Sequence, residues 1–185
     1  IHRNAAQQAR TEMKSYAAGG SSNTPADVLE LMFKIAGVMS AKGIMLRCSE
    51  VSEADRTFIK GSKGRFHSFV PFGFTDELEG DGEFGTSFSP WAIQSDIGPS
   101  SGDATFARSL DPQFLMLSKA EKQWEVVANS LIYGLDRVSV AKMLICWSEP
   151  GDHVERYITK AEKAGVKVLN LALPQDRAKI ESWTR

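Results

Sequence analysis

The sequence predicts an α/β fold in which a mainly parallel sheet of about five or more strands is flanked by helices. Short apolar runs alternate with helical patterns along most of the 185 residues, and this alternation is typical of repeated β-α-β units. Residues 141–147 form a nearly continuous apolar run, as expected for a central strand that is covered on both faces. Polar N-caps before the helical patterns and glycines after them separate the elements.

The expected elements follow one another in a regular order along the chain. Strands are expected at Ser15–Ala18, Ile44–Cys48, His67–Pro71, Ala141–Trp147 and Val166–Leu171. Helices are expected to begin at the N-caps Thr24, Ser52 and Ser118 and at Asp152, and a last short helix covers Pro174–Trp183. The glycine- and aromatic-rich stretch before Ser118 has no periodic pattern, so we expect regular structure to return only at that residue.

Length and composition indicate one globular domain without a membrane span. We expect a single domain over residues 1–185, with an N-terminal extension at 1–14 and a glycine- and aromatic-rich insertion at 72–115. The formal net charge of −1 excludes a basic field over the whole surface, on which non-specific nucleic-acid binding depends. Cys48 and Cys146 lie in apolar runs, which favours buried thiols in a reducing compartment. No apolar stretch reaches ~18 residues, and no signal-peptide pattern is present, so we expect a cytoplasmic protein.

The loop after the first strand is the first candidate binding site. Ligands of open parallel sheets bind at the carboxyl ends of the strands, where helix N-termini direct N–H groups outward. The loop contains Gly19, Gly20, Ser21, Ser22 and Thr24. Glycines allow the backbone to approach a phosphate closely, and hydroxyl groups add donors. A tight β–α turn that needs flexible residues explains the same loop about equally well.

Several motifs follow one another in the order and spacing of a known superfamily. They are Tyr16–Pro25, the segment from Gly43 to Phe58, Asn129 with Gly134, and Met143–Ser148 followed by Gly165–Leu171. Together they resemble phage and bacterial proteins of the SLOG superfamily, which includes DNA-processing protein A and the LOG nucleotide-processing enzymes. The resemblance covers residues 16–171, with 75–115 poorly matched. It implies a Rossmann-like fold, a nucleotide or nucleic-acid ligand, and the host cytoplasm as location if the protein is phage-encoded.

The chain departs from this superfamily at both of its later phosphate-binding loops. Cys48–Glu53 stands where the family has Ser-Gly-Gly-Ala-x-Gly, and Asp152–Glu155 stands where it has Gly-Gly-Thr-Gly. Acidic side chains repel a bound phosphate, and Cβ atoms block a close approach of the backbone. We therefore expect a non-catalytic binding or assembly protein without a cofactor. Two alternatives are nucleotide or nucleic-acid binding, through Gly19–Thr24 and Arg47, and LOG-like nucleotide hydrolysis.

The acidic residues at these loops have two interpretations. They would suit a divalent metal or acid/base chemistry if they converged at the sheet edge with His153. We favour the other interpretation, in which they are first-turn acids that stabilise helix dipoles, and we predict no metal site. The residues concerned are Glu50, Glu53, Asp152 and Glu155.

Two further groups of residues complete the candidate sites. Arg47 and Asp55 are the best retained polar pair of the resemblance, and they join Gly19–Thr24 as candidate ligand-binding residues. We expect them to form an internal ion pair rather than a catalytic pair. Five aromatic residues of the insertion are candidates for contact with a partner protein or a second copy of the chain, or they fold over the sheet edge: Phe72, Phe74, Phe84, Phe88 and Trp91.

Overall fold

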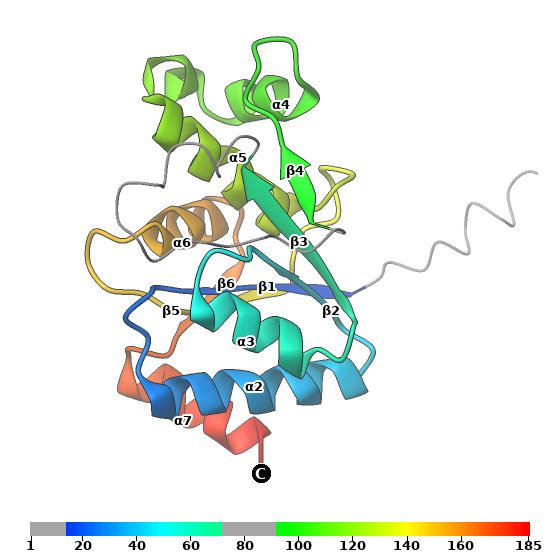
Figure 1. The fold of residues 1–185 in the computed structure, drawn as a ribbon, viewed down its shortest axis with the longest axis vertical. Coiled ribbons are helices and arrows are strands. Elements are labelled where there is room, and N and C mark those ends of the chain that lie inside the picture. Colours follow the sequence, from blue (N-terminus) through cyan, green and yellow to red (C-terminus); the bar gives the residue numbers. More distant parts are fainter. Residues whose placement is uncertain (1–13, 72–91) are drawn as a thin grey trace, which may run out of the picture.

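The computed structural model describes residues 14–71 and 92–185, which form a six-stranded parallel sheet covered by helices (Figure 1). The strand order is β4-β3-β2-β1-β5-β6, and every neighbouring pair is parallel. The predicted α/β, Rossmann-like class is therefore confirmed. The strands are β1 Ser15–Gly20, β2 Met45–Cys48, β3 Phe66–Pro71, β4 Ile93–Ser95, β5 Met143–Trp147 and β6 Lys167–Asn170.

Helices cover the sheet in two layers that Figure 1 shows on opposite sides of the central strands. One core contains α2, α3 and α7, and the other contains α5 and α6. A small third core joins α4 and the short 3₁₀ helix η2 to α5. The helices are α2 Ala26–Ala41, α3 Glu53–Gly61, α4 Gly102–Leu110, η2 Pro112–Met116, α5 Lys119–Tyr133, α6 Val154–Lys163 and α7 Pro174–Trp183.

The alternation of side chains along the central strands explains the two cores. In β1, Tyr16 and Ala18 face the core with α2, whereas Ala17 faces the core with α5. In β5, Ile145 and Leu144 divide in the same way. Successive side chains of a strand point to opposite faces, so a strand buried on both faces needs an unbroken apolar run. The run at 141–147 in the sequence has this origin.

Three expected helix boundaries are confirmed by the backbone and by the caps. Ser52 with Asp55 and Ser118 with Glu121 both form complete capping boxes, at the starts of α3 and α5. Gly134 ends α5 with a φ of 74°, a conformation that residues with a Cβ seldom adopt. Local sequence signals therefore fix these ends of the helices.

The expected N-cap Thr24 is wrong, because the structure begins α2 one residue later. Pro25 occupies the cap position without a side-chain cap bond, and the Thr24 hydroxyl instead donates to the carbonyl of Ser21 at 2.7 Å. Asp27 accepts from Arg177 of α7 at 2.7 Å. A local turn bond of Thr24 and a tertiary ion pair of Asp27 have therefore replaced the capping box that the spacing of these two residues predicts.

The prediction that regular structure returns only at Ser118 is also wrong. β4 extends the sheet beyond β3, and α4 and η2 follow before Ser118. β4 has only three residues, which is too short for an alternating pattern. α4 is amphipathic over nine residues, and its buried face consists of Ala104 and Ala107, so a hydrophobic stripe of large side chains is missing from the sequence.

Two simpler expectations concern thiols and membranes. Cys48 and Cys146 are both buried and form no disulfide, as expected. Within residues 14–71 and 92–185, no helix has the length and apolar character that a membrane crossing requires.

Candidate functional site

The first candidate site lies where the strand order reverses, between β1 and β5. β1 pairs with β2 on one side and with β5 on the other, so the loops after β1 and β5 lead to helices on opposite faces of the sheet. Such a switch point is the usual ligand site of an open α/β sheet. The loops that meet there are residues 21–25, 49–52 and 148–153.

The loop after β1 uses most of its N–H groups in contacts within the protein. The N–H of Ser21 donates to the carbonyl of Trp147 at 3.2 Å, and the N–H of Thr24 donates back to the carbonyl of Ser21 at 3.2 Å. The N–H of Asn23 donates to the Ser21 hydroxyl at 3.1 Å, while the Asn23 amide donates to Glu149 at 3.1 Å. The loop is therefore closed on itself and tied to the loop after β5, with Ser22 exposed at its tip.

Gly19 and Gly20 are required by close packing. A Cβ added to Gly20 would lie 2.4 Å from the Cβ of Ala54 in α3 and 2.9 Å from the Thr24 hydroxyl oxygen. A Cβ added to Gly19 would lie 3.0 Å from the ring of Tyr157 in α6. Helices α3 and α6 thus approach the end of β1 from opposite faces. The glycines serve this approach in the structure, whether or not they also meet a ligand.

Asp55 gathers the donors of two loops in the interior. Its carboxylate accepts the N–H of Gly20 at 3.4 Å, of Val51 at 3.2 Å and of Ser52 at 3.1 Å, and the hydroxyl of Ser49. The side chain is 0% exposed. Burial raises the pKa of this carboxyl, while nearby His153 and the hydrogen bonds lower it. The four donors satisfy a group that would otherwise be costly to bury.

The expected ion pair between Arg47 and Asp55 is wrong. The Arg47 guanidinium, 6% exposed, donates to the carbonyl oxygens of Ser139 at 2.6 Å and Ile132 at 3.4 Å. It therefore holds the chain that follows α5, near Gly134, and burial lowers its pKa. Arg47 is therefore separated from the rest of the candidate ligand-binding set, because its side chain lies on the α5 face of the sheet.

The acidic residues at the later loops do not converge. Glu50 is buried and accepts from the Ser68 hydroxyl at 2.6 Å, whereas Glu53 and Glu155 are exposed in the first turns of their helices. Asp152 accepts the N–H groups of its own loop and of α6. In the part of the chain that the structure describes, no cluster of three or more possible ligands could hold a metal ion.

His153 and Tyr157 lie beside Asp55 and were not expected to do so. The His153 ring stacks on Trp124 with centroids 4.4 Å apart and meets the edge of Tyr157 at 5.6 Å. Burial lowers the pKa of His153, against the opposing charges of Asp55 and Asp152. The Nε2 of His153 and the hydroxyl of Tyr157 are buried without a partner among the described residues. The i,i+4 spacing places His153 and Tyr157 on one side of the start of α6, but no spacing connects them with Trp124 of α5 or Asp55 of α3.

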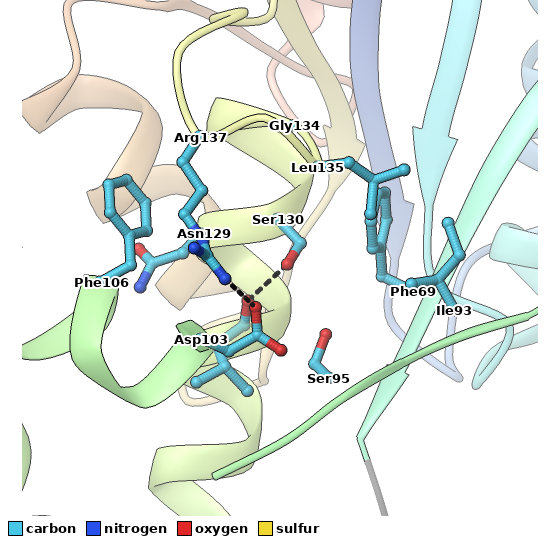
Figure 2. Close-up of a pocket in the computed structure, with 11 residues that line it drawn as sticks. Phe69, Ile93, Ser95, Asp103, Phe106, Asn129, Ser130, Gly134, Leu135 and Arg137 are labelled. Atoms are coloured by element: carbon cyan, nitrogen blue, oxygen red, sulfur yellow. Dashed lines mark hydrogen bonds and ion pairs between the residues drawn. The ribbon is translucent and has the colours of Figure 1, made fainter. Parts of the chain in front are cut away.

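The second candidate site is a pocket of about 120 Å³ between β3, β4, α4 and α5, drawn in Figure 2. Its apolar lining comes from Phe69, Ile93, Phe106, Val126 and Leu135. Its polar lining comes from Ser95, Asp103, Asn129, Ser130 and Arg137. Asp103 and Arg137 form an ion pair at 3.3 Å, so the charges in the lining compensate each other.

Asn129 is the unusual residue of this pocket. It lies in α5 and is 3% exposed, and neither its amide nitrogen nor its amide oxygen has a hydrogen-bond partner within the described residues. A buried carboxamide without partners is costly, and a group of this kind in a native structure needs an explanation. The sequence singled out Asn129 as part of a motif, but not the pocket, because its other wall lies in the region that lacks a periodic pattern.

The remaining candidate residues lie outside the described ranges. Phe72, Phe74, Phe84, Phe88 and Trp91 all fall in residues 72–91, so their role as a partner contact stays a prediction. Among the other candidates, Gly19 and Gly20 end β1 next to Asp55, and Ser21, Ser22 and Thr24 follow in the loop after it.

Comparisons with known proteins give a likeness in fold and no family. No protein-family model and no curated protein sequence matches the chain. Two structures of the molybdenum cofactor carrier protein from Chlamydomonas reinhardtii are similar, each with a TM-score of 0.49 and 14% identity, over 91% of this chain and 83% of that chain. At this identity the likeness concerns the course of the chain alone. The SLOG resemblance stays an expectation from the motifs.

Proposed function

We propose that this chain is a non-catalytic binding protein on a Rossmann-like scaffold whose phosphate-binding loops have become internal contacts. The observation that carries the proposal is the buried carboxylate of Asp55, which accepts N–H groups of Gly20, Val51 and Ser52. In a nucleotide site such N–H groups would face a phosphate. Here they face a side chain of the protein.

The charges around the switch point support the same proposal. Glu149 and Asp152 lie on the loop after β5, and Glu149 accepts from Asn23 of the loop after β1. A phosphate at this position would meet carboxylates and would have to displace existing hydrogen bonds. Both effects weaken the binding of an anion.

The burial of Asp55 also argues against catalysis at this position. A general acid or base must come within hydrogen-bond reach of the group that it protonates or deprotonates. Asp55 is 0% exposed and already accepts four donors. We therefore favour binding over the LOG-like hydrolysis that the motif resemblance suggests.

Protein contacts, including assembly of a phage-encoded protein, form the second half of the proposal. Support comes from η2, where Leu115 and Met116 are exposed large apolar side chains. Large exposed apolar patches are typical of contact surfaces, and these two side chains would form part of one. Light scattering coupled to size-exclusion chromatography will test self-association through η2. The double variant Leu115→Ser/Met116→Ser should lower the mass of the oligomer. An unchanged mass in the variant excludes η2 as an interface between copies of the chain.

The binding half of the proposal is tested with nucleotides. We expect no change in thermal stability and no heat of binding with ~1 mM AMP, ATP, inorganic phosphate or a single-stranded oligonucleotide, and no release of base or phosphate. A Kd of ~100 μM would raise the stability by about 1.4 kcal/mol at 1 mM ligand, which calorimetry detects easily. Binding of AMP that is lost in Ser21→Arg or Gly20→Val, in a variant that remains folded, would overturn the proposal in favour of a nucleotide site.

A further inference from the structure

The pocket around Asn129 is a site of a different kind from the switch point. The pocket lies on the α5 side of the sheet. None of its lining residues belongs to the switch-point loops 21–25, 49–52 and 148–153. Its walls come from β3, β4, α4, α5 and the loop that follows α5. Figure 2 shows Phe69, Ile93 and Leu135 on one side of the Asp103–Arg137 pair and Phe106 with Asn129 on the other.

The size of the pocket limits its ligand to about one ring. A cavity of about 150 Å³ lined by apolar side chains accommodates benzene, and this pocket has a volume of about 120 Å³. Aromatic and aliphatic side chains line much of it, so a flat ring makes favourable contacts there.

The charges of the pocket favour an uncharged ligand. Asp103 accepts from Arg137 at 3.3 Å and also from the N–H of Asp96 at 3.0 Å. Arg137 in addition lies over the Phe106 ring, 5.9 Å from its centroid. Since each charge already has a partner of the opposite kind, an ionic ligand would have to break one of these contacts.

Asn129 defines what the ligand must offer. A carboxamide has one acceptor oxygen and an NH₂ donor side by side, and in Asn129 both are shielded from water and without partners among the described residues. A group with a neighbouring donor and acceptor forms two parallel hydrogen bonds with a carboxamide, as an asparagine does with the edge of a base. Ser130 cannot supply the missing partner with its proton, because its hydroxyl donates to the carbonyl of Val126 at 3.0 Å.

We infer that this pocket binds an uncharged, planar, single-ring compound that carries a cyclic amide, and that Asn129 turns toward the ring to pair with its N–H and C=O. The inference deepens the proposed binding function and rests on it. It also gives a reason for an unpaired carboxamide in the middle of a helix: the side chain is retained for the ligand, at the expense of the stability of the free protein.

The test uses 2-pyridone, the smallest ring with an adjacent N–H and C=O, as the probe on the full chain. We expect a Kd of ~1 mM, since a fragment of this size binds at that level when its contacts are well made. N-methyl-2-pyridone lacks the N–H and should bind about tenfold more weakly. Titration followed by ¹⁵N–¹H spectra should shift the side-chain NH₂ signals of Asn129 with 2-pyridone. Benzoate, which is charged, should not compete.

Matched variants separate the carboxamide from general effects. Asn129→Leu should bind 2-pyridone at least about tenfold more weakly, as expected for the loss of two hydrogen bonds, while its melting temperature stays equal or rises. Asn23→Leu makes the same chemical change in the loop after β1 and should leave the Kd within about twofold. If Asn129→Leu fails to fold, the Asn129 signals of the unaltered chain and the comparison of the two pyridones still decide.

The outcomes distinguish this inference from the proposed function. Absence of a shift at ~10 mM 2-pyridone, or equal binding of the two pyridones, overturns the cyclic-amide pocket and leaves the result of the nucleotide experiment intact. Nucleotide binding that depends on Gly20 and Ser21 but not on Asn129 overturns the proposed function instead. Binding of 2-pyridone that survives in Asn129→Leu places the ligand elsewhere and also overturns the inference.

Discussion

The end of β1 and the pocket beside α5 each contain a buried polar side chain, and the two side chains differ in their hydrogen bonds. At the end of β1, Asp55 accepts four hydrogen bonds and has no exposed surface. In the pocket, Asn129 is almost as deeply buried, but its carboxamide neither donates nor accepts a hydrogen bond within the described part of the chain. A satisfied buried group stabilises the fold that surrounds it, whereas an unsatisfied one destabilises it.

This difference separates a structural residue from a functional candidate. Asp55 connects β1, the loop after β2 and the start of α3, so its contacts explain why it is there. The contacts of Asn129 do not explain why an asparagine occupies this position, since an apolar residue of the same size would also fit the interior of the helix. The contrast therefore holds between these two side chains, because the Nε2 of His153 beside Asp55 is also buried without a partner among the described residues.

The largest effect is expected from Asp55→Ala. The change leaves three N–H groups and the Ser49 hydroxyl without their acceptor and removes half of the capping box of α3. We expect a loss of about 3 kcal/mol or more in the free energy of unfolding, measured by urea denaturation. Glu53→Ala, in the same helix turn but exposed, should cost less than about 1 kcal/mol. Similar losses in the two variants would contradict a structural role specific to Asp55.

The second-largest effect on stability is expected at Gly20, which allows α3 to pack closely against β1. Gly20→Ala places a Cβ 2.4 Å from that of Ala54, and such overpacking should cost about 1–3 kcal/mol. Gly37→Ala, within α2, meets only a carbonyl oxygen of Gly61 at 3.8 Å, and there the higher helix propensity of alanine should stabilise the protein by about 0.5–1 kcal/mol. Opposite signs in the two urea curves are the expected result, and a neutral Gly20→Ala would show that α3 can move away.

Elements with a local signal could be predicted from the sequence. The capping boxes at Ser52 and Ser118, the helix end at Gly134 and the apolar run of β5 depend on residues close in the chain. The boundaries of these elements agree with the sequence patterns to within about two residues. β4 and α4 carry weak local signals, and they were missed for that reason.

The candidate sites depend on contacts between distant parts of the chain, and these could be predicted only in part. The sequence predicts a strand end at Ala18 and a loop from Gly19, but Gly19 and Gly20 are the last residues of β1 and the loop begins at Ser21. The predicted partner of Arg47 is wrong, because Arg47 lies within β2 and donates to the chain after α5, whereas Asp55 is bound by N–H groups beyond the end of β2 and at the end of β1. The pocket needs residues from 69 to 137, which no spacing rule connects.

The smallest effect is a dependence of the free energy of unfolding on pH, which tests whether the region around Asp55 disfavours a charged His153. Burial lowers the pKa of His153 in the folded protein, so the unfolded chain takes up the proton first as the pH falls below the ordinary value of about 6.5. The contribution of His153 is therefore fully present above that pH and is lost toward lower pH, by at most about 1.4 kcal/mol per pH unit. The raised pKa of Asp55 acts in the opposite direction, so the measurement must compare variants.

We expect the difference in unfolding free energy between the unaltered chain and His153→Gln to shrink between pH 7.5 and 5.5, because only the unaltered chain loses the contribution of His153. His67 also has a pKa lowered by burial and by Arg47, and His67→Gln serves as the control: it removes its own share of the slope and leaves that of His153. A pH-independent difference for His153→Gln would mean that the imidazole is accommodated in its charged form. Asp55 would then be part of an ion pair rather than a satisfied acceptor, and the contrast with Asn129 would rest on the hydrogen bonds alone.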